Sequence, residues 1–363
     1  MSSTAPIALI MAGGTGGHVF PALAVARCLQ ERGLTPVWLG TQHGMESRLV
    51  PEHQIEMEFI SIGGVRGKGI HTLLFAPIKL ARAIWQAIKV IQRVKPVIVF
   101  GAGGFVSGPG GIAAWLLRKP LVIHEQNAIA GMTNRWLARI ADRVFEAFPN
   151  SFSQAAICVG NPVRREIAAI EPPAVRFTTR HDAIRVLVVG GSLGARRLNE
   201  LLPAALALIP ANQRPQVIHQ AGEKNLVLAQ SAYRKHEVVG DVRAFIQDMA
   251  EMYRWADLVV CRAGALTVSE LAAAGVASLL VPFPAAVDDH QTQNAQFLVK
   301  ADAAVVIQEK ELTEQRLAEL LQHLCQQGRR RLLQMAENAR ACAIVDADAR
   351  IADACLSLAG GMA

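Results

Sequence analysis

The chain has 363 residues, a formal net charge of +7 and a pI near 9.3, and 52% of its residues are hydrophobic. That length and apolar content exclude a disordered protein and indicate two domains, each with its own core. The basic excess lies in residues 1–163, which have 15 basic and 8 acidic side chains, whereas residues 164–363 have 22 of each. The pI is therefore a property of one region and does not by itself indicate a nucleic-acid-binding protein.

The sequence shows no targeting or metal-binding signal. Residues 96–117 are uncharged but contain six glycines and two prolines, which a lipid-facing helix tolerates poorly. No basic segment precedes the first apolar run, so we expect no signal peptide. The six cysteines form neither a C-x-x-C pair nor a set with metal-ligand spacing. We therefore expect a cytoplasmic protein with reduced thiols and with no metal or other cofactor.

Short apolar runs alternate with longer helical patterns along the chain. Continuous apolar runs are typical of parallel strands that are buried on both faces, and the helices between them supply the crossovers. The sequence therefore predicts a doubly wound α/β fold. The expected strands are Ile7–Ala12, Val37–Leu39, Val97–Phe100, Leu121–His124, Val144–Ala147, Val186–Val189, Val217–Gln220, Leu258–Cys261 and Ser278–Val281.

A strand, a glycine loop and a helix follow one another twice, from residue 7 and again from residue 185. This repeat predicts two similar domains, expected over 1–163 and 164–340, with a joint near 160–163 or within 171–182. Ligands of such sheets bind at the carboxyl ends of the strands, so we expect the site in the cleft between the domains. An Ala-rich helical pattern begins near Leu332. The sequence leaves open whether the C-terminal helix over 341–363 packs back on the first domain.

The loop Gly13–Gly17 lets backbone N–H groups approach a ligand at the start of a helix. It is not a dinucleotide-binding loop, because Val19 stands where the third glycine of that pattern would be. The pair Gly67-Lys68 does not fit a P-loop either, which argues against NAD and ATP enzymes. His18 directly follows the loop, where it is either a helix-capping or packed histidine or a functional one.

Two further loops open helices in the second half. Ser192 adds a hydroxyl to the second glycine loop, as a ligand contact or as a helix cap. The segment from Arg262 to Glu270 begins with a glycine turn whose unpaired amides suit a phosphate. The carboxylate of Glu270 suits a ribose diol, although an ordinary solvated glutamate is the alternative.

Two polar segments follow strands. His124, Glu125, Gln126 and Asn127 end the strand at 121–124, at the edge of the sheet where polar groups usually line a site. The segment from Asp288 to Asn294 lacks the ligand spacing of a metal site, so we expect hydrogen bonding there.

Residues 66–95 are basic and predict an amphipathic helix. Its two faces are an apolar one with Leu74, Ile78, Ala81, Trp85 and Ile88, and a polar one with Lys79, Arg82, Gln86, Lys89 and Arg93. A sheet-covering helix is the ordinary interpretation, but a polar face without acids favours an anionic membrane surface. Nucleic acid is the rival partner, and we do not expect it because the segment lacks a base-stacking motif in which aromatic residues alternate with the basic ones.

Six segments together resemble the MurG family, bacterial transferases that move N-acetylglucosamine (GlcNAc) from UDP-GlcNAc to a lipid-linked N-acetylmuramoyl (MurNAc) pentapeptide. The resemblance runs in order along essentially the whole chain, at residues 13–21, 103–109, 124–127, 160–164, 190–195 and 262–270. It implies the GT-B glycosyltransferase fold, in which two Rossmann-like domains face each other.

The resemblance also implies roles for single residues. The nucleotide would be held by Arg164, Ser192, Phe245, Ile246, Gly264, Ala265, Leu266, Thr267, Val268, Ser269, Glu270 and Gln291. The donor sugar or the diphosphate would be reached by Thr15, Gly16, Gly17, Asn127 and Asn294. Asn134 and Asn199 match further polar positions of the family. Phe105 departs from the tyrosine of many relatives, so a hydroxyl at this position is not required in this chain.

The implied reaction transfers GlcNAc to the 4-hydroxyl of MurNAc in lipid I, with inversion and without a metal, and gives lipid II. His18 or Glu125 would be the base, and histidine is favoured because its ordinary pKa lies near neutral pH. The protein would act at the cytoplasmic face of the inner membrane, where it could meet other cell-wall synthesis proteins. A UDP-GlcNAc 2-epimerase of similar architecture and a non-catalytic nucleotide- or nucleic-acid-binding protein remain alternatives.

Overall fold

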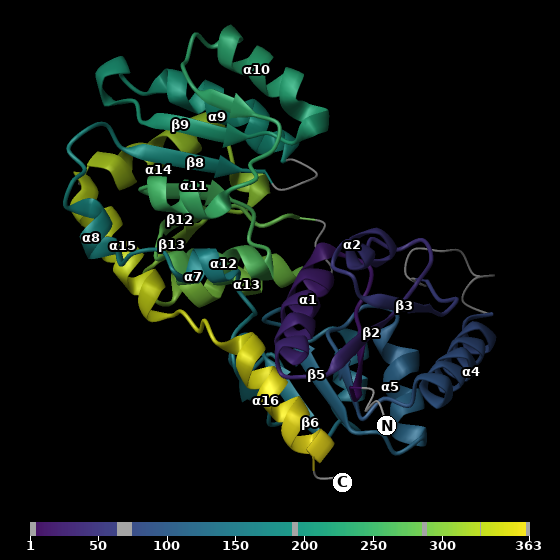
Figure 1. Cartoon of the computed structure of the whole chain (residues 1–363). Helices are drawn as coiled ribbons and strands as arrows, with labels where there is room; N and C mark the ends of the chain where they lie inside the picture. The colour runs from purple at the N-terminus through teal and green to yellow at the C-terminus, as the bar shows by residue number, and fades with distance from the viewer. Residues whose placement is uncertain (1–4, 64–74, 191–194, 285–288, 327, 361–363) are drawn as a thin grey trace. The chain divides into compact units, whose positions relative to one another are not determined.

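In the computed structural model, the described residues are 5–63, 75–190, 195–284, 289–326 and 328–360. The chain divides into two units, each an α/β body with its own sheet and helices (Figure 1). Unit 1 comprises residues 1–162 together with 345–363, and unit 2 comprises residues 163–344.

Unit 1 is built on a parallel sheet of seven strands in the order β3-β2-β1-β4-β5-β6-β7. Its strands are β1 (Ile7–Met11), β2 (Thr35–Gly40), β3 (Glu56–Phe59), β4 (Ile98–Gly101), β5 (Leu121–Glu125), β6 (Arg143–Glu146) and β7 (Ile157–Cys158). Its described α-helices are α1 (Gly16–Glu31), α2 (Glu46–Glu52), α4 (Ala76–Val94), α5 (Ser107–Leu116), α6 (Met132–Leu137) and α16 (Ala347–Gly360).

Unit 2 has a parallel sheet of six strands in the order β10-β9-β8-β11-β12-β13. The strands are β8 (Arg185–Val189), β9 (Gln216–Gln220), β10 (Asp241–Arg243), β11 (Leu258–Cys261), β12 (Ala277–Leu280) and β13 (Ala304–Val306). Its described α-helices are α7 (Arg165–Ala168), α8 (Pro173–Phe177), α9 (Arg196–Leu208), α10 (Leu226–Lys235), α11 (Met249–Trp255), α12 (Ala265–Ala274), α13 (His290–Val299), α14 (Glu314–Gln326) and α15 (Gly328–Ala341).

All nine expected strands are present, with ends shifted by at most two residues. The four strands that sequence analysis missed, β3, β7, β10 and β13, are the outermost strands of the two sheets. Each is only two to four residues long, and β3 and β10 contain charged residues. An edge strand has one exposed side and a partner on only one side, so it does not need a continuous apolar run.

Each sheet has one point where the strand order reverses, between β1 and β4 in unit 1 and between β8 and β11 in unit 2. At such a point the loops after the two strands leave in opposite directions and open a crevice at the carboxyl ends. In unit 1 these loops are residues 12–15 and 102–106. In unit 2 the loop after β11 is residues 262–264, and Gly190 begins the loop after β8.

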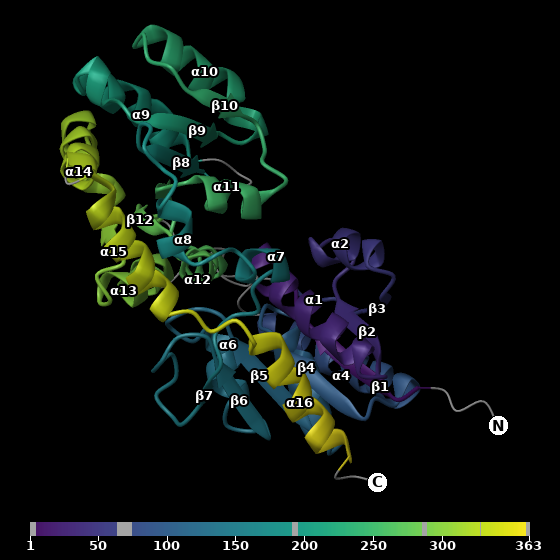
Figure 2. The same ribbon diagram turned by 60° about the vertical axis from the view of Figure 1, so that its left-hand side comes forward.

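The Ala-rich pattern near the C-terminus is not one helix. It forms α15, which packs on α8 and α12 in unit 2, and α16, which packs on α1 and β4 in unit 1. Figure 2 shows α16 beside α1. The Cys28 thiol donates to Asp348 at 3.2 Å, and Arg32 pairs with Asp353 at 3.0 Å. The acids of α16 thus lower the basic excess of the unit that holds the N-terminal residues.

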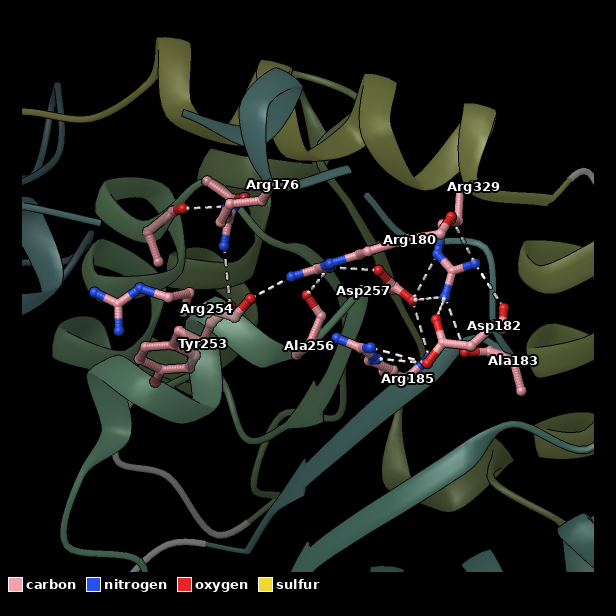
Figure 3. A network of polar contacts seen from close by, with 12 residues as sticks. Arg176, Arg180, Asp182, Ala183, Arg185, Tyr253, Arg254, Ala256, Asp257 and Arg329 are labelled. Carbon is pink, nitrogen blue, oxygen red and sulfur yellow. Dashed lines mark hydrogen bonds and ion pairs between the residues drawn. The ribbon is translucent and has the colours of Figure 1, made fainter. Parts of the chain in front are cut away.

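A network of hydrogen bonds and ion pairs joins arginine side chains to Asp257 and to backbone carbonyls within unit 2 (Figure 3). Asp257 is fully buried and accepts hydrogen bonds from Arg180, from the Arg185 amide and from Arg329. Arg176 donates to the carbonyls of Tyr253 and Ala274, at 3.0 and 2.9 Å. Burial lowers the pKa of Arg176 to about 10, so it stays charged at neutral pH. A cation at the last carbonyls of α12 stabilises that helix through its dipole.

Candidate active site

The glycine loop of unit 1 contacts the loop after β4. Gly14 has φ of 98° and Gly104 has φ of 83°, a backbone region that favours glycine. A Cβ atom on Gly104 would lie 2.1 Å from the carbonyl oxygen of Gly13. Only a glycine at position 104 lets the two loops approach each other this closely.

Glu46 stabilises the glycine loop through hydrogen bonds, a role that the sequence did not predict. Its side chain is buried and accepts hydrogen bonds from the Gly14 amide at 3.2 Å and from the Thr41 amide and hydroxyl at 3.0 and 2.7 Å. The Gly14 amide is therefore engaged inside the protein. Gly16 and Gly17 are the first residues of α1, and N–H groups at that position have no partner within a helix. These two amides are the ones that the loop offers to a ligand.

His18 and the polar segment after β5 come together in unit 1. The Nδ1 atom of His18 lies 2.9 Å from Oε1 of Gln126, and Nε2 of Gln126 lies 3.1 Å from Nδ1 of His124. Nε2 of His124 lies 2.9 Å from the carbonyl oxygen of Gly160. His124 is fully buried, and burial lowers its pKa to about 4, so it is neutral. Of these three linked side chains, His18 is the one that is partly exposed to solvent.

Glu125 is buried, and its carboxylate is fully occupied. Oε1 accepts from the amide and the side chain of Asn127, at 3.0 and 3.2 Å. Oε2 accepts from the Gly131 amide at 3.0 Å and from the Asn134 side chain at 2.9 Å. A carboxylate has about four acceptor positions, and four donors fill them. This geometry holds the loop between β5 and α6 in place.

In unit 2, α12 begins at the switch point of the sheet. Gly264 caps the helix, and Ala265, Leu266 and Thr267 form its first turn, where amides have no helical partner. Val268 already donates to the Gly264 carbonyl at 2.9 Å. Amides without a helical partner at the start of a helix are the kind of group that binds anions in proteins. The Arg262 side chain instead donates to the carbonyls of residues 281 and 282, both at 3.2 Å, and joins β11 to the end of β12.

Glu270 lies two turns into α12 and meets two donors. Arg164 Nε donates to Oε1 at 3.0 Å, and the Tyr253 hydroxyl donates to Oε2 at 3.3 Å. Burial raises the pKa of Glu270, and the charge of Arg164 partly opposes that rise. Within the part of the chain that the structure describes, these two donors leave about two acceptor positions of the carboxylate unfilled. Arg164 and Glu270, which the sequence proposed separately, are thus one ion pair.

Gln291 and Asn294 on α13 form hydrogen bonds with the backbone of Ala263, in the loop that precedes α12. Gln291 Oε1 accepts from the amides of Ala263 and Phe283, at 3.2 and 2.9 Å. Asn294 is buried and donates to the Ala263 carbonyl at 3.2 Å. In this structure their bonded atoms hold the loop that presents the amides of α12.

The remaining expected site residues divide into exposed and internal ones. Phe245 is 57% exposed, whereas Ile246 is buried and donates its amide to Gln220 at 3.0 Å, a partner that sequence analysis missed. Asn199 is buried and bonds to His219 and to the Ala221 carbonyl. Ser192 lies outside the described residues. Within the described part of the chain, no group of three His, Cys, Asp or Glu side chains could hold a metal ion.

Helix α4 has one face in the core and one in solvent. The buried face is made of small and β-branched residues, Ala83, Ala87, Val90 and Ile91. On the other face Ile78 is 66% and Trp85 is 55% exposed, and Lys89 Nζ lies 3.6 Å above the centre of the Trp85 ring. Arg93 pairs with Glu58 on β3. Arg66, Lys68 and Leu74 lie outside the described residues. None of the described helices is long and apolar enough to cross a membrane.

Comparison with known families identifies both units. The glycosyltransferase family 28 N-terminal domain matches residues 8–146, and the C-terminal domain of the same family matches residues 185–351. The chain belongs to glycosyltransferase family 28. The expected glycosyltransferase activity and the expected fold of two Rossmann-like domains are thereby confirmed.

Relatives in this family match over nearly the full length. A Marinobacter nauticus protein is 57% identical over 97% of this chain and 98% of its own length. A Nitrosococcus oceani protein is 53% identical over 97% and 99%. Both are named UDP-N-acetylglucosamine–N-acetylmuramyl-(pentapeptide) pyrophosphoryl-undecaprenol N-acetylglucosamine transferase.

Solved structures share this fold. Acinetobacter baumannii MurG is 42% identical over 97% of this chain and 99% of that one, with a TM-score of 0.86. The calicheamicin glycosyltransferase CalG4 is 15% identical with a TM-score of 0.69 and shows the fold alone. The resemblance of this family 28 chain to the MurG transferases is confirmed.

Proposed function

We propose that this chain transfers GlcNAc from UDP-GlcNAc to the 4-hydroxyl of MurNAc in undecaprenyl-linked lipid I, giving lipid II with inversion at the anomeric carbon. The observation that carries the proposal is the match to relatives that are named for this donor and this acceptor, over 97% of this chain in each case. The arrangement of groups in each unit supports it.

Unit 2 has the groups that a nucleotide diphosphate requires. The free amides of the first turn of α12 and the guanidinium of Arg164 would bind the diphosphate. The two unfilled acceptor positions of Glu270 would bind the ribose diol while Arg164 and Tyr253 stay in place. The same positive groups would stabilise the charge that develops on UDP as it leaves.

In unit 1 the geometry favours His18 over Glu125 as the base. A base needs a free lone pair within reach of the hydroxyl from which it takes a proton. The carboxylate of Glu125 already accepts four hydrogen bonds, whereas His18 is partly exposed and has one ring nitrogen bonded. Glu125 would then act as a positioning residue for Asn127.

The test is UDP release from UDP-GlcNAc, measured with and without a lipid I analogue. We expect release only with the acceptor, together with a disaccharide product. Conversion of UDP-GlcNAc alone to its ManNAc epimer would instead support an epimerase. No release with any acceptor would contradict the proposed transfer.

We further propose that the exposed face of α4, with Ile78, Lys79, Arg82, Trp85 and Lys89, binds the anionic cytoplasmic surface of the membrane. Lys79, Arg82 and Lys89 are exposed and have no carboxylate within ion-pair distance among the described residues, and each basic residue near a headgroup layer contributes ~1 kcal/mol. The exposed Trp85 adds an apolar, interface-seeking ring beside them. An acceptor held in the membrane needs such a surface on its enzyme.

Vesicle binding separates this surface from general basic charge. The triple variant with Lys79, Arg82 and Lys89 changed to Gln should bind phosphatidylglycerol vesicles on the order of 100-fold more weakly or worse, at three lost basic contacts. Its turnover with a water-soluble acceptor should not change. As a control, Gln at Lys224, Arg234 and Lys235, exposed positions of unit 2, should leave binding intact. Equal losses in both triple variants would contradict a specific surface.

A further inference from the structure

Three hydrogen bonds run in line through unit 1, from the Gly160 carbonyl to His18. They join Gly160 to His124, His124 to Gln126 and Gln126 to His18, with lengths of 2.9, 3.1 and 2.9 Å. His124 and Gln126 are at most 1% exposed, so water does not substitute for these partners. Imidazole and amide groups can each point in two ways, and the chain of bonds decides which way each one points.

The direction is set at the Gly160 end. A carbonyl oxygen only accepts, so the proton of the neutral His124 ring must be on Nε2, and its Nδ1 must accept. The Gln126 NH₂ group then faces His124, and it also donates to the His124 carbonyl at 3.3 Å. The Gln126 oxygen consequently faces His18, whose Nδ1 must donate.

We propose that Gln126, oriented by His124 and the Gly160 carbonyl, is a positioning residue that fixes His18 in the tautomer with its proton on Nδ1. This places the free lone pair on Nε2, the ring nitrogen that is not bonded to Gln126. The proposal rests on the proposed role of His18 as base, and it explains why Nε2 of His18 is unprotonated and can accept a proton.

The proton and electron balance of the step is simple. Nε2 of His18 takes the proton of the acceptor hydroxyl, and the electron pair of that O–H bond forms the new C–O bond to GlcNAc. The bond between GlcNAc and UDP breaks, and its electrons go to the leaving diphosphate. Nδ1 of His18 donates to Gln126 before and after this transfer, so no hydrogen bond has to be rebuilt as the imidazolium forms.

The surroundings of His18 contain few other groups that titrate. His124, on β5, is linked to His18 through Gln126 and is neutral. The carboxylate of Glu125 already accepts four hydrogen bonds. Gly103, in the loop after β4, lies close to the His18 ring. A Cβ atom at this position would be 3.0 Å from Nδ1 of His18 and 3.5 Å from the side-chain nitrogen of Asn134. Glu46, from α2, is engaged with Gly14 and Thr41. The neutral side-chain amide of Gln126 is the hydrogen-bond partner of His18 whose effect the experiments below measure.

The tautomer is directly measurable in the unaltered protein. Long-range ¹H–¹⁵N spectra of the histidine-labelled full chain, recorded at about pH 8.5 where ordinary histidines are neutral, distinguish a proton on Nδ1 from one on Nε2. His18→Ala identifies the signals of His18 by their loss. We expect a protonated Nδ1 and a bare Nε2 at His18, and the opposite pattern at His124. A proton on Nε2 of His18 would overturn the proposal.

Gln126→Met removes the acceptor and keeps the size of the side chain. Its His18 signals should lose the Nδ1 preference, and turnover should fall on the order of 10- to 100-fold, as for other partners that orient a histidine. The KM for UDP-GlcNAc should not change. Gln154→Met is the matched control, because Gln154 bonds to the Ala138 carbonyl in the same unit.

Gln126→Glu gives a second readout. A carboxylate beside Nδ1 stabilises the imidazolium, so the acidic limb of the pH–rate profile should move up by roughly one pH unit. Unchanged turnover in Gln126→Met, with folding intact, would overturn the positioning role. Full turnover in His18→Ala would instead remove the proposed base, while the tautomer would still be decided by the spectra of the wild-type protein.

Discussion

Glu125 in unit 1 and Glu270 in unit 2 are both largely buried carboxylates beside a switch point, but they differ in their hydrogen bonds. Four donors surround Glu125, whereas among the described residues the side chain of Glu270 accepts from Arg164 and Tyr253. A saturated carboxylate holds the protein together, and a half-filled one can still accept a ligand. The two glutamates thus differ in the number of donors around the carboxylate and not in residue type, and this difference supports the proposed role of Glu270 in ligand binding.

The same difference extends to the two units. Unit 1 has a histidine with Nδ1 bonded to Gln126 and a glutamate with four donors. Unit 2 has the first-turn amides of α12 and, among the described residues, a glutamate with two donors. Under the proposed function, unit 1 would take the proton and unit 2 would bind the nucleotide diphosphate, so we expect mutations in the two units to change different kinetic constants.

The largest expected effect is that of His18→Ala. Loss of a general base lowers kcat by ~10²–10⁴-fold, and donor binding should change little because the proposed contacts to UDP-GlcNAc do not include the His18 side chain. Steady-state kinetics with a lipid I analogue separate kcat from the donor KM. A normal kcat would break the assignment of proton transfer to unit 1.

Glu125→Gln should mainly destabilise unit 1. Glutamine replaces one acceptor oxygen by an NH₂ group, which would face the donors that now bond to the carboxylate. Buried donors left without acceptors cost about 2–3 kcal/mol of unfolding free energy. Denaturant unfolding measures this loss. If Glu270→Gln cost as much, the distinction between the two carboxylates would fail.

Glu270→Ala should raise the KM for UDP-GlcNAc about 10- to 100-fold, the value of hydrogen bonds to a charged acceptor. It should change kcat little, since the ribose does not react. Calorimetric titration with UDP gives the affinity without turnover. Unchanged UDP affinity would remove Glu270 from the ribose and leave the unfilled positions without a ligand.

The smallest expected effect is a pH dependence of donor binding. Burial raises the pKa of Glu270 above 4.5, and protonation replaces an acceptor by an O–H group. UDP affinity should therefore fall severalfold as the pH drops through that raised pKa, and Glu270→Gln should abolish the dependence. A dependence that survives in Glu270→Gln would belong to another group.

The stability of the free protein has the opposite dependence on pH. Because the pKa of Glu270 is higher in the folded than in the unfolded state, its protonated form favours folding. This contribution is complete below the unfolded pKa and disappears as the pH rises through the folded one. The thermal unfolding temperatures of wild type and Glu270→Gln, compared across this range, measure it.

The sequence by itself determined the parts that rest on local chemistry. Apolar runs located every inner strand, and glycine spacing located the loops at residue 13 and residue 264. Glu270 was recognisable because it is the single charge in an apolar stretch between Arg262 and Asp288. These features follow from the few residues around each position, so a sequence pattern is sufficient to find them.

Only the tertiary structure decided which distant groups meet. Glu46 lies 32 positions from Gly14, and Gln126 lies 108 positions from His18, so no local pattern connects them. The exposed face of α4 was likewise decided by packing, because Ala83 and Ala87 are buried in the core of unit 1 while the larger Ile78 and Trp85 remain in solvent. A sequence specifies which atoms can donate or accept, but the number of partners that each one finds depends on the fold.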